Sequence, residues 1–294
     1  MLYLTACPVC QGKNLVPYLS CKDNTVSHET FQLESCAVCG FVMTNPRPGE
    51  NNLPRYYQSD TYISHSDGSS TPLDLLYKLS RKFTLKWKYS LIQQYSLAKP
   101  LSILDYGCGT GSFLKQCERR KMAVTGVEPS AVARSHAQKD SQIQIFQDIS
   151  EIKDNFDVIT LWHVLEHVSD LHKTLNVLKA RLHETGTMFI AVPNLNSPDA
   201  RKYREHWAAY DVPRHLWHFS QTTMDLVLRQ HQLHIHKIQP MRLDAYYVSL
   251  LSEKYKTSHN VVLRITKALI NGWKSNRAAK LTNDYSSLIY IVRK

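Results

Sequence analysis

The sequence contains no apolar run long enough to cross a lipid bilayer, and its first residues lack the basic and apolar segments of a secretory signal. We therefore expect a cytoplasmic protein without a transmembrane segment. Internal repeats and low-complexity tracts are also missing, which argues against a repeat architecture. The 294 residues are enough for one large domain and one small one, with a core that needs no disulfides.

Acidic residues are scarce: 25 Asp and Glu stand against 36 Lys and Arg, for a formal net charge of +11. This balance fits an anionic partner, such as a phosphorylated small molecule, nucleic acid or lipid headgroups. The basic residues are scattered along the chain, so the charge alone does not choose among these partners or set them apart from a merely basic surface.

Four of the seven cysteines form two Cys-x-x-Cys pairs near the N-terminus. In a reducing compartment such pairs are typical of metal ligands, and two of them complete a tetrahedral zinc site. Four thiolates leave no open position, so we expect a structural zinc ion in a small ribbon. The predicted ligands are Cys7, Cys10, Cys36 and Cys39.

Three regions follow from composition: a zinc ribbon at 1–45, a Tyr-rich linker with a basic amphipathic helix at 46–99, and a main domain at 100–294. The linker is dense in tyrosine at Tyr56, Tyr57 and Tyr62, which we expect either to pack or to cover a ligand site. The basic helix fits packing on the core with a solvated face, and it is also compatible with contact to a membrane surface.

From residue 100 onward, strand patterns alternate with helix patterns, which predicts an α/β fold with helices on both faces of a doubly wound sheet. We expect a helical insertion at about 242–285 before the last strand. The predicted strands are 101–105, 123–128, 143–146, 156–161, 187–192, 233–238 and the C-terminal residues. The predicted helices are 111–120, 131–139, 171–182 and 221–229.

A glycine-rich loop follows the first of these strands. Asp105 precedes Gly107, Gly109 and Gly111, and the next strand ends at Glu128. Glycine permits positive φ and close approach of a ligand to the backbone, and a carboxylate at Glu128 can bind both hydroxyls of a ribose. A dinucleotide loop would read Gly-x-Gly-x-x-Gly, whereas here every second residue is glycine.

Residues 103–111 resemble the first motif of class I S-adenosylmethionine-dependent methyltransferases, and 126–130, 156–168 and 186–194 resemble their later motifs. The resemblance implies a seven-stranded, mostly parallel sheet with an antiparallel last strand and S-adenosyl-L-methionine across the strand ends. It also implies seven cofactor-binding residues. These are Asp105, Gly107, Gly109, Gly111, Glu128, Asp148 and His163.

The cysteine pairs, Asn45-Pro-Arg-Pro and the stretch 211–220 are similar to bacterial zinc-ribbon methyltransferases, including sugar C-methyltransferases. This likeness implies a small-molecule acceptor, such as a sugar or surface-polysaccharide precursor. A base for the acceptor proton should come from the loops after the fourth and fifth strands. We expect His215 in that role, with Tyr210 and His167 as further catalytic residues; a structural role for His215 is an equal alternative.

Residues 163–167 also match His-x-x-Glu-His, an inverted zinc-protease signature. A protease would place this segment in the middle of a helix, whereas here it follows a strand and coincides with the fourth methyltransferase motif. We therefore reject the protease interpretation.

Two other functions compete with small-molecule methylation. An RNA methyltransferase would fit the ribbon and the charge, but the Asn/Asp-Pro-Pro-Tyr/Phe motif of base-amine methylation is missing after the fourth strand. A non-catalytic interaction module would not need the intact glycine loop. Cofactor binding and salt-dependent RNA binding separate the three.

Overall fold

The computed structural model describes residues 1–57, 72–97, 101–139, 141–256 and 260–294, with the side chains of the helix that begins at Pro72 described from residue 83 onward. The predicted linker tyrosine Tyr62 lies outside this part of the chain. The chain forms α-helices and short 3-10 turns around its sheets. They are η1 (Glu50–Tyr57), α2 (Pro72–Tyr95), α3 (Ser112–Glu118), α4 (Ala131–Gln138), η2 (Ile149–Glu151), α5 (Leu171–Arg181), α6 (Pro198–Tyr203), α7 (Gln221–Gln230), α8 (Asp244–Lys256) and α9 (Val261–Thr282).

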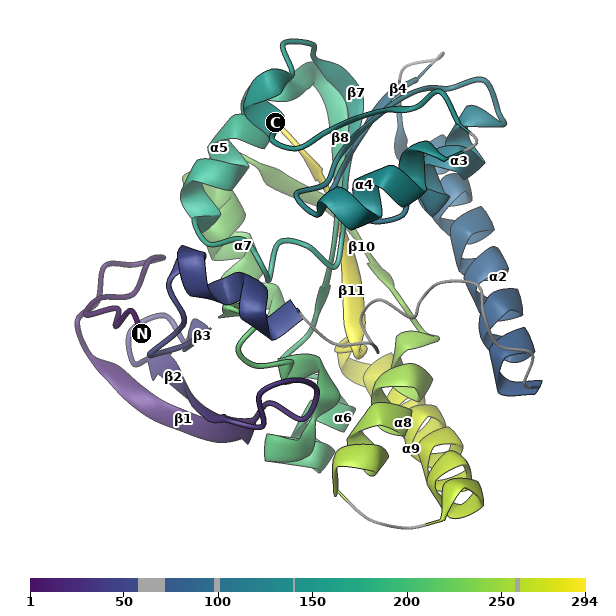
Figure 1. Ribbon diagram of the computed structural model, residues 1–294. Helices are drawn as coiled ribbons and strands as arrows, with labels where there is room; N and C mark the ends of the chain where they lie inside the picture. Colours follow the sequence, from purple (N-terminus) through teal and green to yellow (C-terminus); the bar gives the residue numbers. More distant parts are fainter. Residues whose placement is uncertain (58–71, 98–100, 140, 257–259) are drawn as a thin grey trace.

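A seven-stranded sheet runs through the main domain in the order β10-β11-β8-β7-β4-β5-β6 (Figure 1). Its strands are β4 (Ser102–Tyr106), β5 (Ala123–Val127), β6 (Gln144–Phe146), β7 (Phe156–Trp162), β8 (Leu182–Pro193), β10 (His234–Pro240) and β11 (Ser287–Arg293). The adjacent strands β8, β7, β4, β5 and β6 are parallel to one another. Strand β11 pairs antiparallel with both of its neighbours, β8 and β10. The predicted sheet and its antiparallel last strand are confirmed.

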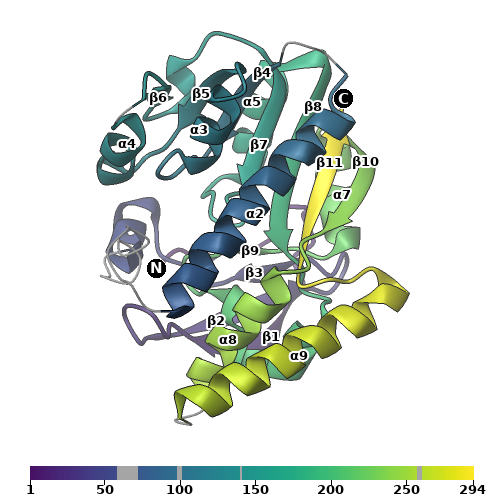
Figure 2. The same cartoon turned by 90° about the vertical axis from the view of Figure 1, so that its right-hand side faces the viewer.

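Helices cover both faces of this sheet, as the continuous apolar strands require (Figures 1 and 2). Along β8, Met188 and Ile190 pack in the cluster that holds the apolar faces of α5 and α7. Phe189 and Ala191 alternate with them and pack in the cluster that holds α2 and α3. Successive side chains of a strand point to opposite faces of the sheet, so the buried residues of β8 contribute alternately to two hydrophobic cores.

Helix starts follow capping residues that the sequence makes visible. Asp170 accepts a hydrogen bond from Lys173 N at the start of α5, and Ser220 forms a reciprocal capping box at the start of α7. The predicted helices in these positions are confirmed to within one or two residues. The basic helix, predicted over residues 73–99, begins at Pro72 and ends at Tyr95.

The N-terminal sheet is not made by the N-terminal residues alone. It has the order β1-β2-β3-β9, and the strands are β1 (Leu15–Lys22), β2 (Thr30–Cys36), β3 (Val42–Thr44) and β9 (Trp217–His218). The last of these comes from the main domain and pairs antiparallel with β3. A strand of two residues carries no sequence pattern of its own, so it exists only through this pairing; the predicted boundary at residue 45 stays a prediction.

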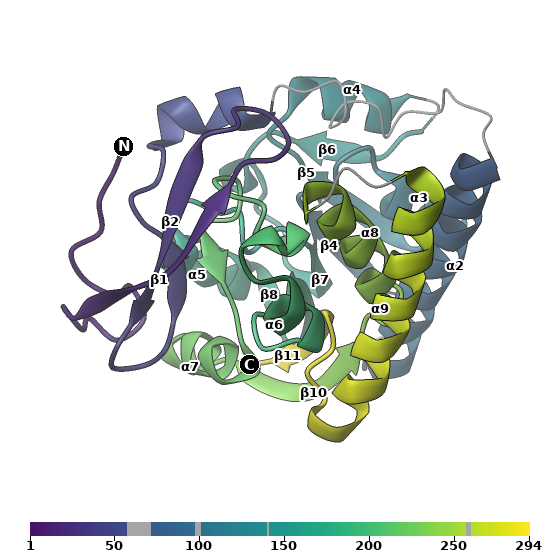
Figure 3. The same ribbon diagram turned by 90° about the horizontal axis from the view of Figure 1, so that it is seen from below.

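The carboxyl ends of the parallel strands share one edge of the large sheet, and this edge faces the rest of the molecule. Figure 3, which looks onto it, shows the N-terminal sheet, α6 and the α8–α9 pair lying across it. Loops after these strands are therefore enclosed by segments from both ends of the chain. Within the described residues no helix is both long enough and apolar enough to cross a membrane.

Candidate functional site

The glycine loop, residues 107–111, joins β4 to α3. Gly107, Gly109 and Gly111 all have positive φ, at 73°, 54° and 69°. A Cβ on Gly107 would lie 2.5 Å from Val164, and one on Gly111 would lie 2.9 Å from Ala137, so these two glycines permit close packing. A Cβ on Gly109 would meet no atom within 4 Å, which leaves this part of the loop open to a ligand.

Glu128 lies beside this open part of the loop, directly after β5. Its Oε2 accepts a hydrogen bond from Gly109 N at 3.0 Å, and its Oε1 accepts one from Ser130 N at 2.8 Å. Each carboxylate oxygen retains a second lone pair, so the side chain can still accept hydrogen bonds from a diol.

Asp105 lies beneath the loop and is only 2% exposed. Thr160 Oγ1 donates to its Oδ1 at 2.6 Å. Burial raises the pKa of Asp105 to about 7, against the opposing effects of Thr160 and Lys88. Its position fits support of the loop from below.

Asp148 follows β6 and caps the short turn η2. Its Oδ1 accepts a hydrogen bond from Ser150 N at 2.8 Å, and the bonds from Ser150 lower the pKa of this exposed carboxyl. Asp148 and Glu128 follow adjacent parallel strands, so both stand at the same edge of the sheet. An adenine contact at Asp148 stays a prediction.

His163 directly follows β7 and has a positive φ of 59°. Its Nδ1 donates to Glu166 Oε1 at 3.3 Å and its Nε2 donates to Asp244 Oδ2 at 3.2 Å. Burial lowers the pKa of His163, but the two carboxylates outweigh burial and raise the pKa to about 9. The ring is thus held as a cation between Glu166 of its own loop and Asp244 at the start of α8, which shows that the helical insertion reaches His163.

Two of the three predicted catalytic residues lie together. The rings of His167 and His215 are in edge contact with centroids 4.5 Å apart, and one ligand atom of each, with one of Glu166, lies within 4.8 Å of the others. We call Glu166, His167 and His215 the histidine cluster. Burial and the neighbouring His215 lower the pKa of His167 to about 4, so its ring is neutral.

Tyr210 is not part of the histidine cluster. Its ring packs against Trp207 and His218, and its hydroxyl interacts with Tyr18 of β1. Burial, followed by the effect of Tyr18, raises the pKa of Tyr210 far above its usual range. The position fits a packing role between the loop and the N-terminal sheet, and a catalytic role stays a prediction.

The loop that carries His215 is fastened to the N-terminal region by Arg214, which is 1% exposed. Arg214 binds Asp211 through two nitrogens, at 2.9 and 2.5 Å, and donates to Asp23 Oδ1 at 3.1 Å and to Tyr56 O at 2.9 Å. Because one buried guanidinium binds Asp211, Asp23 and Tyr56 together, it fixes the segments that carry these three residues relative to one another. The sequence carries no local signal for Asp23, because its partner is distant in the chain.

Further bonds join the same segments. Thr44 Oγ1 of β3 donates to His215 O at 2.7 Å, and Leu216 N donates to Glu166 O at 2.8 Å. The hydroxyl of Tyr57 lies 3.1 Å from His167 Nδ1. One of the linker tyrosines therefore lies against the histidine cluster; that these tyrosines cover a ligand site stays a prediction.

The four predicted zinc ligands converge within 4.8 Å. Sγ atoms of Cys7 and Cys39 are 3.6 Å apart, and those of Cys10 and Cys36 are 3.4 Å apart. Burial raises the pKa of Cys36, but backbone N–H groups of Cys39 and Val38 outweigh it and lower the pKa to about 7. The donor set fits a tetrahedral Zn²⁺ ion, which binds thiolates.

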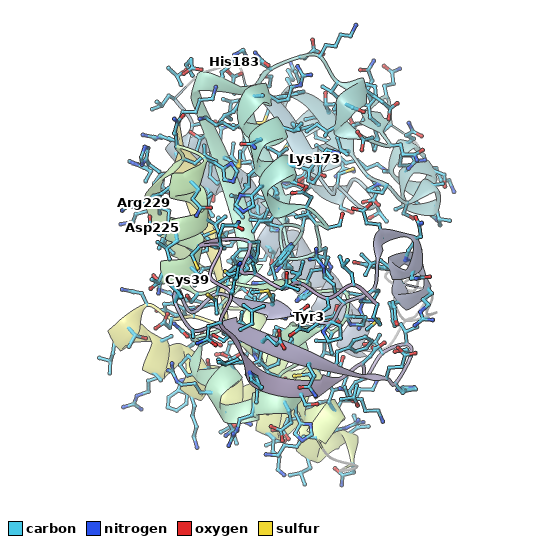
Figure 4. The ribbon with its side chains drawn as sticks, turned by 90° about the vertical axis from the view of Figure 1, so that its left-hand side faces the viewer. Tyr3, Cys39, Lys173, His183, Asp225 and Arg229 are labelled. Atoms are coloured by element: carbon cyan, nitrogen blue, oxygen red, sulfur yellow. The ribbon has the colours of Figure 1, made fainter. Side chains whose placement is uncertain are left out.

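The ribbon is also attached to the large domain beside this cysteine group. His172 Nε2 of α5 donates to Pro8 O at 2.9 Å, and Gln230 of α7 hydrogen-bonds to Val9 O. Figure 4 shows Cys39 of the ribbon and Lys173 of α5 on the same side of the molecule.

A family model described as a methyltransferase domain matches residues 80–238, which is more than half of the chain. This protein belongs to the methyltransferase domain family. The glycine loop, Glu128 and His163 all lie within the matched region, so the fold of this methyltransferase domain and its site coincide.

Known proteins agree with this membership. The chain is 35% identical over 104 residues to a ubiquinone biosynthesis O-methyltransferase of Aeromonas salmonicida, covering 32% of this chain and 44% of that protein. It is 28% identical over 138 residues to one of Coxiella burnetii, covering 44% and 56%. The chain spans about half the length of the curated relatives it matches.

Solved structures share the fold at low identity. Magnesium protoporphyrin IX methyltransferase of Synechocystis PCC 6803, with bound S-adenosylhomocysteine (SAH), has a TM-score of 0.53 and 13% identity, covering 83% of this chain and all of that one. The mycolic acid cyclopropane synthase CmaA1 has a TM-score of 0.52 and 12% identity, covering 83% and 94%. These likenesses extend the class I methyltransferase fold over most of the chain.

Proposed function

We propose that this methyltransferase domain protein transfers a methyl group from S-adenosyl-L-methionine to a small molecule. One observation carries the proposal: the open Gly109 lies hydrogen-bonded to Glu128 at the edge where His163 and the histidine cluster also stand. Glu128 would bind the ribose, Asp148 the adenine, and the glycine loop would lie along the cofactor. His163, as a cation, would sit near the cofactor carboxylate.

The acceptor would bind between the glycine loop and the histidine cluster. Val164 packs on Gly107, so the two regions are neighbours. Methyl transfer needs an acceptor atom in line with the sulfonium methyl and a place for its proton. We infer a hydroxyl-bearing acceptor, because the named relatives are O-methyltransferases; a sugar or a surface-polysaccharide precursor is one such molecule.

We further propose that Cys7, Cys10, Cys36 and Cys39 hold a structural Zn²⁺ ion. The ion would stabilise the ribbon. Strand β3 of this ribbon pairs with β9 and hydrogen-bonds to the loop that carries His215. Four free thiols in a metal-binding arrangement also support a reducing compartment, the cytoplasm.

The direct test is methyl transfer from labelled cofactor into a fractionated cell extract, together with calorimetry of cofactor binding. We expect label in the small-molecule or glycan fraction, and we expect Glu128→Ala to weaken cofactor binding by about 10-fold, the loss of one charge-assisted contact. Label found only in RNA would show that the acceptor is RNA and not a small molecule. A protein that does not bind S-adenosyl-L-methionine would refute the proposed methyltransferase activity.

A further inference from the structure

The histidine cluster has the composition of a metal site that is separate from the cysteine group. Glu166 and His167 come from the loop after β7, and His215 comes from the loop before β9. One ligand atom from each side chain lies within 4.8 Å of the other two. Two imidazoles and a carboxylate are the ligands of many catalytic zinc and non-haem iron sites.

The two histidines are oriented as metal ligands are. His167 Nδ1 lies 3.1 Å from Arg214 O, and His215 Nδ1 lies 2.9 Å from Ala209 O. A carbonyl oxygen only accepts hydrogen bonds, so each Nδ1 carries a proton, and in this tautomer of a neutral ring Nε2 offers the lone pair that a metal ion needs. Metal-binding histidines are held in this way by backbone carbonyls, which fix both the tautomer and the ring.

The Glu166 carboxylate points to a bound cation or donor independently of the histidines. Glu166 is 1% exposed, and its Oε1 is bound by His163. Its Oε2 is buried without a hydrogen-bond partner in the described part of the chain. An ionised oxygen in that position is costly unless a donor or a cation meets it.

A hydrogen-bonded network explains these side chains less well. Among the described residues, the ion pair given for His215 Nε2 is with Asp211 Oδ2 at 3.9 Å, which is too far for a hydrogen bond. We propose that Glu166, His167 and His215 bind a divalent transition-metal ion. Imidazole ligands favour Zn²⁺, Fe²⁺ or Co²⁺ over Mg²⁺ and Ca²⁺, and three protein ligands leave at least one coordination position open.

The open position has a use that rests on the proposed function. An acceptor hydroxyl bound there would lose its proton to solvent at neutral pH, because coordination lowers the pKa of a bound oxygen acid. The oxygen would then form a bond to the sulfonium methyl as the S–CH₃ bond breaks, and S-adenosylhomocysteine would leave. His215 would act as a metal ligand, which replaces its predicted role as the base.

The test is a Co²⁺ titration of the metal-depleted full chain, followed by absorption spectroscopy and by elemental analysis after dialysis. Cobalt in the cysteine group shows thiolate charge-transfer absorption, whereas cobalt bound by nitrogen and oxygen does not. We expect both components in the wild-type protein. We also expect Glu166→Gln and His215→Gln to weaken the nitrogen–oxygen component by at least about 100-fold, more than the loss of an outer-shell partner costs.

His218→Gln is the matched control, because it removes another buried histidine, which ends β9 directly after the His215 loop and lies outside the histidine cluster. It should keep both components. A wild-type spectrum with only thiolate-bound cobalt would overturn the proposal, whether or not the variants fold, and so would a nitrogen–oxygen component that persists in both variants. Calorimetry with S-adenosyl-L-methionine is separate, so failure of the metal site would leave the proposed function standing.

Discussion

The glycine loop and the histidine cluster stand at the same edge of one sheet but are held in different ways. The glycine loop is fixed by its sequence neighbours, β4, α3 and β5, through bonds such as Gly107 N to Val127 O. The histidine cluster is held by five parts of the chain: its own two loops, Asp23, Thr44 and Tyr56. The N-terminal region therefore contacts the histidine-bearing loop and also carries the group of four cysteines.

This difference implies that the two regions can be damaged separately. Loss of the ribbon should displace the histidine cluster, because Thr44 and Asp23 bind the loop that carries His215. The glycine loop is bonded instead to Val127 of β5 and to Glu128. Variants that affect one region and spare the other would show that the two regions are held independently, and variants that affect both equally would contradict this.

The largest effect is expected from Cys36→Ser combined with Cys39→Ser. Structural zinc contributes about 10 kcal/mol or more to folding of such modules, so β3 would lose its support. We expect methyl transfer to fall by at least about 100-fold through misplacement of the His215 loop, with the dissociation constant of S-adenosyl-L-methionine changed by less than about 3-fold. Turnover and calorimetry measure the two.

Cys21→Ser is the control, because Cys21 is buried in β1 but lies outside the four-thiol group. It should retain both turnover and cofactor binding. An equal loss of cofactor affinity in the double variant would show that the glycine loop also depends on the ribbon.

A smaller loss is expected when Asp23 becomes Asn. The variant removes one partner of buried Arg214, and breaking a buried ion pair costs about 3 kcal/mol. Burial raises the pKa of Asp23, but the Ser27 N–H and Arg214 outweigh burial and lower it below its ordinary value of 3.8. The contribution is therefore present above that value and lost as pH falls below it.

Urea unfolding of wild-type and Asp23→Asn protein should show this as a gap in the free energy of unfolding that narrows in acid. Glu29→Gln, which changes an exposed partner of Arg55 in the same region, is the control and should show a small, weakly pH-dependent gap. A gap of equal size at neutral and acidic pH would mean that the Asp23 charge is not what joins ribbon and loop.

Gly109→Ala should act on the ligand more than on the fold. Its new Cβ meets no protein atom, and left-handed φ costs an alanine about 1 kcal/mol of stability. We expect cofactor affinity to fall by at least about 10-fold, because the Cβ occupies the space that the ligand needs. Calorimetry and thermal melting separate the two effects.

Gly107→Ala is the matched comparison, since its Cβ would lie 2.5 Å from Val164. It should lose more stability than Gly109→Ala, because Val164 must move together with the loop of His167. Unchanged cofactor affinity in Gly109→Ala would refute the assignment of the glycine loop.

The smallest effect is expected from Asp225→Ala on the exposed face of α7 (Figure 4). Asp225 pairs with Arg229 at 2.7 Å, with exposed fractions of 36% and 68%. Such a pair contributes about 0.3–0.5 kcal/mol, so the melting temperature should barely move. A change in cofactor binding or turnover in this variant would show that the exposed face of α7 is coupled to the glycine loop or to the histidine cluster, which we do not expect.

Sequence alone determined the parts whose signals are local. The alternation of strands and helices, the caps at Asp170 and Ser220, the glycine loop with Glu128, and the two cysteine pairs are each encoded within a few residues. Backbone conformation and metal-ligand spacing depend on near neighbours, and the sheet and the convergence of the four thiols follow from them.

Contacts between residues far apart in the chain are set by the packing of the folded protein. The pairing of β9 with β3, the link from Arg214 to Asp23 and the contact of His163 with Asp244 join segments far apart in the chain. No periodicity or spacing encodes such contacts, because they depend on how whole elements pack. The same packing brought His215 beside Glu166 and His167, and so turned a rejected protease signature into two ligands of a proposed metal site.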